Sequence, residues 1–289
     1  MMQPPRLIEE KEEIGETDQI DGSLHCVTKH TELWKRIIHI AASVVEEGTL
    51  LFTASGMRIH SFFNSQCAFL NVDLKRNMFA EFDLTEDSLP LGQSFKKMNK
   101  VLHRLRNQDI LSVSYLGEDN VCYEVCNGGD KNIKRIRHLK LLTVSGTVPL
   151  VNTTYGHELK VASHYFHEMI EDLSSNGGEK VKILMTNERT VWSVEDVDGS
   201  EIVPWRHHSE GEIVSEESTT SVQLIKGTEE ELELCFALKP FLQASKAFPL
   251  SRHVKISFAS DLPAPTVKIE YLLDEDLGRL VFVLAARSA

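Results

Sequence analysis

Four segments of the chain have the periodicity of amphipathic helices, near residues 31–46, 92–107, 162–175 and 237–248. In each segment apolar residues recur at spacings of three and four, which places them on one side of a helix. Stretches of alternating polar and apolar residues follow each segment, and this alternation predicts strands with one buried face. The pattern therefore predicts an α+β protein in which helices cover one face of antiparallel β-sheets.

The order of these elements repeats along the chain. Residues 33–62 and 165–195 share an amphipathic helix, a glycine-containing turn, an alternating strand, a polar turn and a second strand. Residues 94–125 and 237–272 match in the same way, with helix, strand, hairpin and strand. Two similar halves follow, each with two helices and several antiparallel strands. We expect a disordered acidic tail at 1–23, an N-terminal domain at 24–142, a connector loop at 143–157 and a C-terminal domain at 158–289.

Length and composition are consistent with two ordinary domains. The 289 residues are 42% hydrophobic, enough for two cores. No apolar run approaches the roughly 18 residues that span a bilayer, and the N-terminus is polar and acidic, so we expect a soluble intracellular protein. Five cysteines without a CxxC pair argue against a disulfide framework and a structural zinc site. We expect neither a metal nor a cofactor.

The distribution of charge is the most informative feature. The chain has 43 acidic against 31 basic residues and a net charge of -12, yet residues 236–260 contain four bases and no acid. The helix near 92–107 also presents only bases, and the first helix exposes Lys35 and Arg36. Ordinary solvent-facing helices mix both signs, whereas an acid-free basic face can neutralise phosphates. Because no aromatic or glycine-rich reading element lies beside these helices, we expect sequence-independent binding of duplex DNA.

The C-terminal stretch, residues 234–287, carries a family resemblance. It contains Glu270-Tyr271, an acidic turn from Asp274 to Gly278, and a last hydrophobic strand that ends in Leu284-Ala285-Ala286. These features resemble the C-terminal half-domain of the sliding DNA clamps, proliferating cell nuclear antigen and its archaeal and viral relatives. Residues 55–74 and 102–113 look like first-domain segments of that family, so the resemblance covers nearly everything after residue 24.

The resemblance implies a fold and a function. Members have two similarly folded domains per chain, and three chains close into a ring whose helices line the hole. Such a ring is a polymerase processivity factor: it encircles duplex DNA, has no chemistry of its own, and tethers the polymerase, the clamp loader and other replication and repair enzymes. The family therefore implies a homotrimer that acts in the nucleus of a eukaryote or of a virus with a eukaryotic host, and otherwise in the cytoplasm.

Site residues follow from the helix phases and the resemblance together. The DNA-binding candidates are Lys35, Arg36, Lys96, Lys97, Lys100, Arg104, Lys239 and Lys246. The subunit interface is expected to pair residues 135–141 with residues 201–205 through Ile136, Leu139, Leu141, Val203 and Trp205, beside the acids Glu195, Asp196 and Asp198. The expected groove for a partner peptide is lined by Phe62, Cys67, Val148, Leu150, Val151, Tyr155, Pro263, Val283, Leu284 and Ala285.

Departures from the family concern the third helix and the groove. Glu168 and Glu171 stand where the family usually presents arginines, so this sector of the hole is expected to attract phosphate less. Gln66 and Cys67 stand where the family usually has His and Val, so the preferred peptide is expected to differ from the common one.

Two alternatives remain open from the sequence. The segment HYFHEMIED places His164, His167, Glu168 and Glu171 at helical spacings that can hold a metal, as in a metal-dependent enzyme, but it lacks the HExxH order, and a solvated helix face explains it more simply. The other alternative is a subunit of the heterotrimeric checkpoint clamp, which shares the fold.

Overall fold

The computed structural model describes residues 23–63, 68–127, 130–143, 154–196, 199–208, 221–228, 231–260 and 265–286, without the side chains of 130–134. These parts of the chain contain four α-helices and eighteen strands. No helix within them is long and apolar enough to cross a membrane.

The N-terminal half begins with a strand and a helix and continues with two groups of strands around a second helix. Its elements are β1 (Leu24–Thr28), α1 (Thr31–Val44), β2 (Glu47–Thr53), β3 (Gly56–Phe62), β4 (Ala68–Lys75), β5 (Glu81–Leu84), β6 (Ser88–Ser94), α2 (Phe95–Leu102), β7 (Asp109–Tyr115), β8 (Asn120–Asn127) and β9 (Asp130–Lys140).

The C-terminal half repeats this order, so that each element of the first half has an equivalent in the second. Its elements are β10 (His157–Ala162), α3 (Ser163–Ser175), β11 (Lys180–Met185), β12 (Arg189–Asp196), β13 (Gly199–His208), β14 (Val222–Lys226), β15 (Leu232–Ala237), α4 (Leu238–Ser245), β16 (His253–Ala259), β17 (Thr266–Leu272) and β18 (Gly278–Ala285). The predicted α+β fold with two similar halves is confirmed.

The helices match residue by residue, which fixes the equivalences between the halves. Positions 1, 4, 7, 8 and 11 are buried in both α1 and α3. Positions 1, 4 and 8 are buried in both α2 and α4. These positions form the apolar stripe that packs on a sheet. In α1 and α3 they are Thr31, Trp34, Ile37, Ile38 and Ala41, and Ser163, Phe166, Met169, Ile170 and Leu173.

The predicted ends of two helices are wrong. The helix expected at 92–107 covers only Phe95–Leu102, because Gly92 to Ser94 belong to β6 and the Ser94 hydroxyl caps the helix by accepting from the backbone N–H of Lys97 at 3.5 Å. Arg104 therefore follows the helix, in a turn where the N–H of Leu105 donates to the carbonyl of Leu102. The helix expected at 237–248 ends at Ser245 and is followed by a separate 3₁₀ turn, Phe248–Leu250.

The strands form two sheets. One has five strands in the order β5-β1-β7-β8-β9, and the other has thirteen, in the order β15-β11-β12-β13-β14-β10-β16-β17-β18-β4-β3-β2-β6. The larger sheet is continuous through both halves because β18 pairs antiparallel with β4, from Gly278 opposite Leu74 to Leu284 opposite Ala68. We call this pairing the internal joint.

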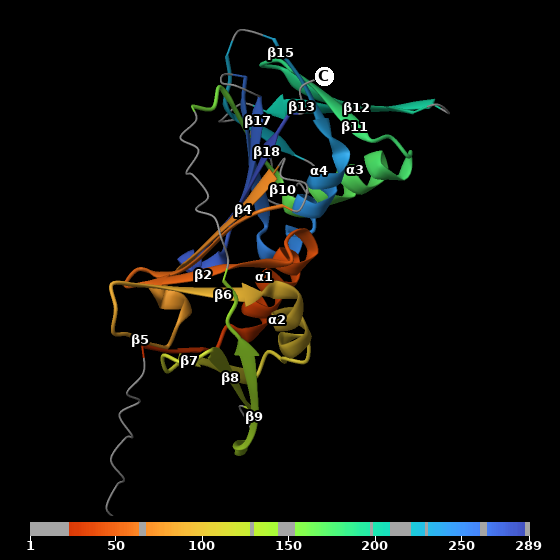
Figure 1. Ribbon diagram of the computed structural model, residues 1–289. Coiled ribbons are helices and arrows are strands. Elements are labelled where there is room, and N and C mark those ends of the chain that lie inside the picture. The colour runs from red at the N-terminus through yellow and green to blue at the C-terminus, as the bar shows by residue number, and fades with distance from the viewer. Residues whose placement is uncertain are drawn as a thin grey trace, which may run out of the picture.

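All four helices lie on the same side of the sheets, on the right in Figure 1. Neighbouring helices in contact are α2 with α1, α1 with α4, and α4 with α3, so the row runs α2-α1-α4-α3. The apolar core fills the space between this row and the sheets, and it includes large side chains such as Trp34, Phe95, Phe166 and Phe241. The row therefore ends at α2 on one side and at α3 on the other.

Candidate DNA-binding face and contact surfaces

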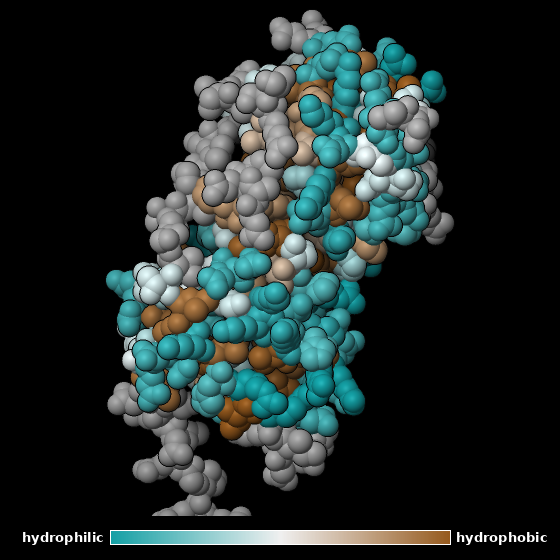
Figure 2. All heavy atoms as spheres, turned by 45° about the vertical axis from the view of Figure 1, so that its right-hand side comes forward, coloured by the Kyte–Doolittle hydropathy of each residue, from teal (hydrophilic) through white to brown (hydrophobic). Residues whose placement is uncertain are grey.

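The helix row carries exposed lysines on the side turned away from the core. In α2, Lys96 and Lys97 are exposed because Phe95 and Met98 occupy the buried face, and in α4 Lys239 is exposed for the same reason. None of the three forms an ion pair with a carboxylate of the described residues. Lys96 and Lys239 are both the second residue of their helix, so the repeat gives them equivalent positions. Lys100 and Lys246 are also exposed. In Figure 2, which turns the helix side towards the viewer, hydrophilic residues cover much of the coloured surface, with hydrophobic patches between them.

Lys35 and Arg36 of α1 are held by contacts within the chain. The ammonium of Lys35 donates to Glu32 at 2.6 Å and to the carbonyl of Leu105 at 3.1 Å. The guanidinium of Arg36 donates to Glu32 at 3.1 Å and to the carbonyl of Pro249 at 3.2 Å. Partial burial alone would raise the pKa of Glu32, but the hydrogen bonds from both bases hold it below its ordinary value. These two bases are therefore partly neutralised, and less positive charge faces outwards here than the sequence predicts.

The exposed face of α3 is acidic. Glu168 lies 3.1 Å from His164, and Glu171 lies 3.5 Å from His167, each four residues earlier. The His167 ring stacks on Phe248, with centroids 4.3 Å apart and planes at 13°. Burial lowers the pKa of His167, which leaves its imidazole uncharged at neutral pH beside the Glu171 carboxylate.

The residues of the metal-site alternative do not converge on one point. His164, His167, Glu168 and Glu171 form two separate pairs along α3, and the described residues contain no group of three His, Cys, Asp or Glu side chains that could hold a metal ion.

Two adjoining hollows of about 570 and 390 Å³ lie at the C-terminal end of α2. We call them together the basic hollow. Among the described residues, Asp109 is the one carboxylate that lines it; it is 3% exposed and accepts from the backbone N–H of Arg106 at 2.9 Å and from Arg135 at 3.2 Å. The basic side chains of the lining are Lys100, His103, Arg104, Arg106, Arg135 and Arg137. The sequence prediction assigned Arg104 to DNA but missed this cluster, because the bases come from two segments that only the fold brings together.

Besides the sheet ends β5, β6 and β15, two strands present edges without a partner along most of their length. In the part of the chain that the structure describes, β9 pairs only with β8, and β13 pairs with β12 but with β14 only at His207 and His208. Ile136 on β9 is 43% exposed, and Ile202 on β13 is 62% exposed. Ile202 lies in the predicted interface segment 201–205, but Val203 and Trp205 were named as its contact residues; the alternation of Ile202 with the inward-facing Val203 is the signal that could have singled it out.

Trp205 was predicted to be an interface residue, but its side chain belongs to the core. It is 1% exposed, and its ring lies 5.2 Å from that of Trp192. The other predicted apolar interface residues, Leu139, Leu141 and Val203, are half-buried and pack against the core. The acids Glu195 and Asp196 are exposed at the end of β12, and Asp198 lies outside the described residues.

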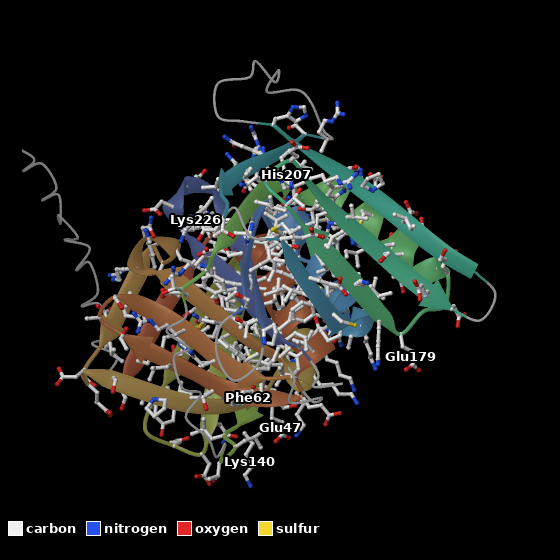
Figure 3. The ribbon with its side chains drawn as sticks, turned by 90° about the horizontal axis from the view of Figure 1, so that it is seen from above. Glu47, Phe62, Lys140, Glu179, His207 and Lys226 are labelled. Atoms are coloured by element: carbon white, nitrogen blue, oxygen red, sulfur yellow. The ribbon has the colours of Figure 1, made fainter. Side chains whose placement is uncertain are left out.

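The described part of the expected peptide groove is a row of side chains on the sheet face opposite the helices. Phe62 is 44% exposed and meets Phe69 edge to face at 6.3 Å, and Val283 lies opposite Phe69 across the internal joint. Lys268 lies opposite Val283, and its ammonium sits 4.9 Å from the centre of the Tyr155 ring. Figure 3 labels Phe62 and Glu47 at the same end of the β2 and β3 pair.

Leu284 does not belong to this row. It is 1% exposed and points into the core, because neighbouring strand residues face opposite sides of a sheet. Ala285 is half-buried and points the same way as Val283. Phe69 was missed by the sequence prediction. Several predicted groove residues lie outside the described residues: Cys67, Val148, Leu150, Val151 and Pro263.

Comparison with known proteins gives one consistent family. Residues 24–146 match the model of the N-terminal domain of proliferating cell nuclear antigen, and residues 150–287 match that of its C-terminal domain. The chain is 26% identical over 258 residues to the proliferating cell nuclear antigen of Dictyostelium discoideum, covering 88% of this chain and 95% of that protein. It is 23% identical over 253 residues to DNA polymerase sliding clamp 2 of Sulfolobus acidocaldarius, covering 87% and 94%.

A solved structure shares the fold. The crystal structure of the proliferating cell nuclear antigen from Entamoeba histolytica matches with a TM-score of 0.79 at 18% identity, over 92% of this chain and 100% of that one.

Proposed function

The chain belongs to the proliferating cell nuclear antigen family of sliding clamps, and from this premise we propose that three copies of it close into a ring around duplex DNA. As a member of that family it is a DNA polymerase processivity factor without enzymatic activity. The proposal adds the oligomer, the joint between its subunits and the residues that meet DNA and partners.

The observation that carries the ring is the internal joint. Strand β18 is the repeat equivalent of β9, and β4 is the equivalent of β13. The joint between β18 and β4 is closed within the chain, whereas β9 and β13 have free edges among the described residues. Free edges bind further strands readily, and a head-to-tail contact that repeats with a suitable rotation closes a ring.

The repeat also supplies a register for this joint. Leu139 pairs with Val121 as Leu284 pairs with Val267, which makes Leu139 equivalent to Leu284. Val203 pairs with Trp192 as Val72 pairs with Ile59, which makes Val203 equivalent to Val72.

The register of the internal joint then gives the residues that face each other in the joint between subunits. Val281 opposite Asn71 becomes Ile136 opposite Ile202, and Phe282 opposite Leu70 becomes Arg137 opposite Glu201. The joint between subunits thus covers two exposed isoleucines and pairs opposite charges, both of which favour cross-strand contact.

DNA lies against the helix row in this proposal. The lysines Lys96, Lys97, Lys100, Lys239 and Lys246 are exposed there, and contacts to phosphate give affinity without sequence preference. Lys35 and Arg36 contribute less, because Glu32 holds both. We propose that the protein acts where the DNA is, which in a eukaryotic cell is the nucleus.

Partners dock on the opposite side of the sheet, on Phe62, Phe69 and Val283 beside Tyr155. These side chains offer apolar and aromatic contacts for a short segment of a polymerase, a clamp loader or another clamp-binding protein. Tyr155 and Lys268 form the polar border of the surface.

Mass in solution tests the proposal. Light scattering of the purified chain at tens of micromolar is expected to give three times the 32.7 kDa of one chain. A second measurement uses a closed circular plasmid and a clamp loader: the protein should stay on the circle and leave after the plasmid is cut once. A monomer at every concentration would contradict the homotrimer and favour a subunit that needs different partners.

A further inference from the structure

Two charged features are not explained by the DNA-binding face: the basic hollow, which shares only Lys100 with it, and the acidic face of α3. The basic hollow lies at the end of α2, and α2 and α3 are the two ends of the helix row (Figure 1). In a ring built head to tail, these two ends meet.

The interior of the row shows how two domains meet on the helix side of the internal joint. Where α1 packs against the end of α4, Arg36 donates to the carbonyl of Pro249 and Gln243 donates to the carbonyl of Ser43, both at 3.2 Å. A small hollow of about 270 Å³ lies between them. Helix α1 supplies one wall through Glu32, Leu33 and Arg36, and the opposite wall comes from the turn after α4 and from the turn between β17 and β18.

The basic hollow has an equivalent of the wall that the turns form, but no equivalent of the wall that α1 forms. It is lined by the turn after α2 and by the β8 and β9 hairpin, which are the repeat equivalents of the turn after α4 and of the β17 and β18 hairpin. The residues that the structure describes provide no helix on its open side. The equivalent of α1 is α3, and α3 of this chain lies at the other end of the row.

We infer that the acidic face of α3 from a second copy fills the basic hollow, as a charged layer on the helix side of the subunit joint. Glu168 is the sixth residue of α3, as Arg36 is the sixth of α1. Arg106 is the fourth residue after the end of α2, as Pro249 is the fourth after the end of α4, so these two positions are equivalent. The contact between Arg36 and Pro249 thus becomes a contact between Glu168 and Arg106, and Glu171 lies one turn further along the same exposed face.

This inference rests on the proposed ring, but it adds something that the ring does not require. On the helix side of the internal joint, α1 and the end of α4 meet through hydrogen bonds to backbone carbonyls. The equivalent contact between subunits would instead pair full charges of opposite sign. Charge complementarity of this kind fixes which surfaces pair and disfavours like-charge pairings. It also makes the joint sensitive to salt, because the side chains are exposed at its rim.

The inference gives the two glutamates a role. Acids that face a DNA channel would weaken DNA binding, but paired with arginines of the neighbouring copy they are neutralised at the edge of the channel. Arg104 and Arg106 are then part of the joint and not of the DNA-binding face.

A charge swap tests this pairing. The first variant is Arg104→Glu with Arg106→Glu, the second is Glu168→Arg with Glu171→Arg, and the third combines all four changes. Each of the first two puts like charges into the joint and should raise the dissociation constant of the assembly by roughly 100-fold, since like charges in contact cost several kcal/mol. The third restores opposite charges and should recover assembly to within about tenfold of the wild type.

The matched control changes the same amount of charge elsewhere. Lys160→Glu with Lys182→Glu alters two exposed strand lysines on the face away from the helices and should leave the assembly unchanged. Mass is measured by light scattering over a concentration series at low and high salt, and circular dichroism verifies that each variant is folded.

The outcomes separate this inference from the proposed ring. A wild type that never assembles would contradict the ring itself. A wild type that assembles, with both reversed variants unaffected or with no recovery in the fourfold variant, would overturn only the charged layer. If Arg104→Glu with Arg106→Glu keeps the mass of the wild type but loses retention on DNA, the basic hollow is a phosphate site and the inference is wrong.

Discussion

Val281 of β18 lies directly opposite Asn71 of β4 in the internal joint, and the repeat gives these two positions to Ile136 and Ile202 at the free edges of β9 and β13. In the proposed ring, this pair of residues within one chain is the template for a contact between two chains. If these edges meet as proposed, both isoleucines become buried, and burial of such a side chain stabilises by about 1.5–3 kcal/mol.

The first prediction concerns this strand joint. Ile202→Asp is expected to raise the dissociation constant of the assembly at least about tenfold, because a carboxylate would replace an apolar contact in the joint. Leu272→Asp is the control, since Leu272 is also 62% exposed but lies on β17, away from both free edges. Light scattering over a dilution series measures the effect. Equal dissociation by both variants would show that β13 is not the edge that pairs.

The second prediction concerns DNA. Lys96→Glu, Lys239→Glu and Lys246→Glu together are expected to abolish stimulation of a polymerase on primed circular DNA and to leave the assembly intact. Each lost phosphate contact should lower the slope of log affinity against log salt by about 0.9. The readouts are DNA retention at several salt concentrations and primer extension.

A control for this variant keeps the change in charge and moves it to the strands. Lys160→Glu, Lys182→Glu and Lys226→Glu alter three exposed lysines outside the helix row. If these strand changes reduce retention as much as the helix changes do, net charge and not the helix face would explain the binding.

The sequence predicted the helix faces well, because helical periodicity is a local property. The exposure of Lys96 and Lys239 follows from apolar residues three and four positions apart, and the structure agrees. Strand phase was harder to predict where both faces carry apolar residues. In the run Val281-Phe282-Val283-Leu284 no polar residue marks the outer side, so Leu284 was assigned to the surface although it faces the core.

Long-range geometry lay beyond the sequence for a different reason. The pairing of Val281 with Asn71 joins residues far apart in the chain, and single-sequence periodicity says nothing about such a register. The basic hollow has the same origin, because Arg104 and Arg135 meet only through the packing of the turn after α2 against the β8 and β9 hairpin. Trp205 was predicted to be an interface residue because the family resemblance suggested the segment 201–205, but its large ring fills the core beside Trp192.

The third prediction concerns partner binding. Phe62→Ala is expected to weaken binding of a fluorescent peptide with the consensus segment of clamp-interacting proteins at least about tenfold, since a few apolar anchors carry most of the affinity in such contacts. Phe62 is half-exposed, so the change should leave the fold intact. Leu272→Ala, an exposed apolar residue on another strand, is the control for fluorescence polarisation. Unchanged affinity for Phe62→Ala would remove this surface as the peptide site.

The last prediction concerns stability and pH, and it starts from His167. Burial lowers the pKa of His167 below its ordinary value of 6.5; Glu171 opposes this shift, and His164 and Lys246 add to it. The unfolded chain therefore takes up a proton at higher pH than the native chain does, so the contribution of this group to stability is present above pH 6.5 and is lost as the pH falls through and below that value.

His167→Gln cannot take up that proton, and between pH 7.5 and 5.5 its urea midpoint should fall by less than the wild-type midpoint. His39→Gln, at an exposed position of α1 that does not contribute to the pKa shift of His167, is the control. An equal fall in the wild type and in His167→Gln would show that protonation of His167 does not limit stability in this range.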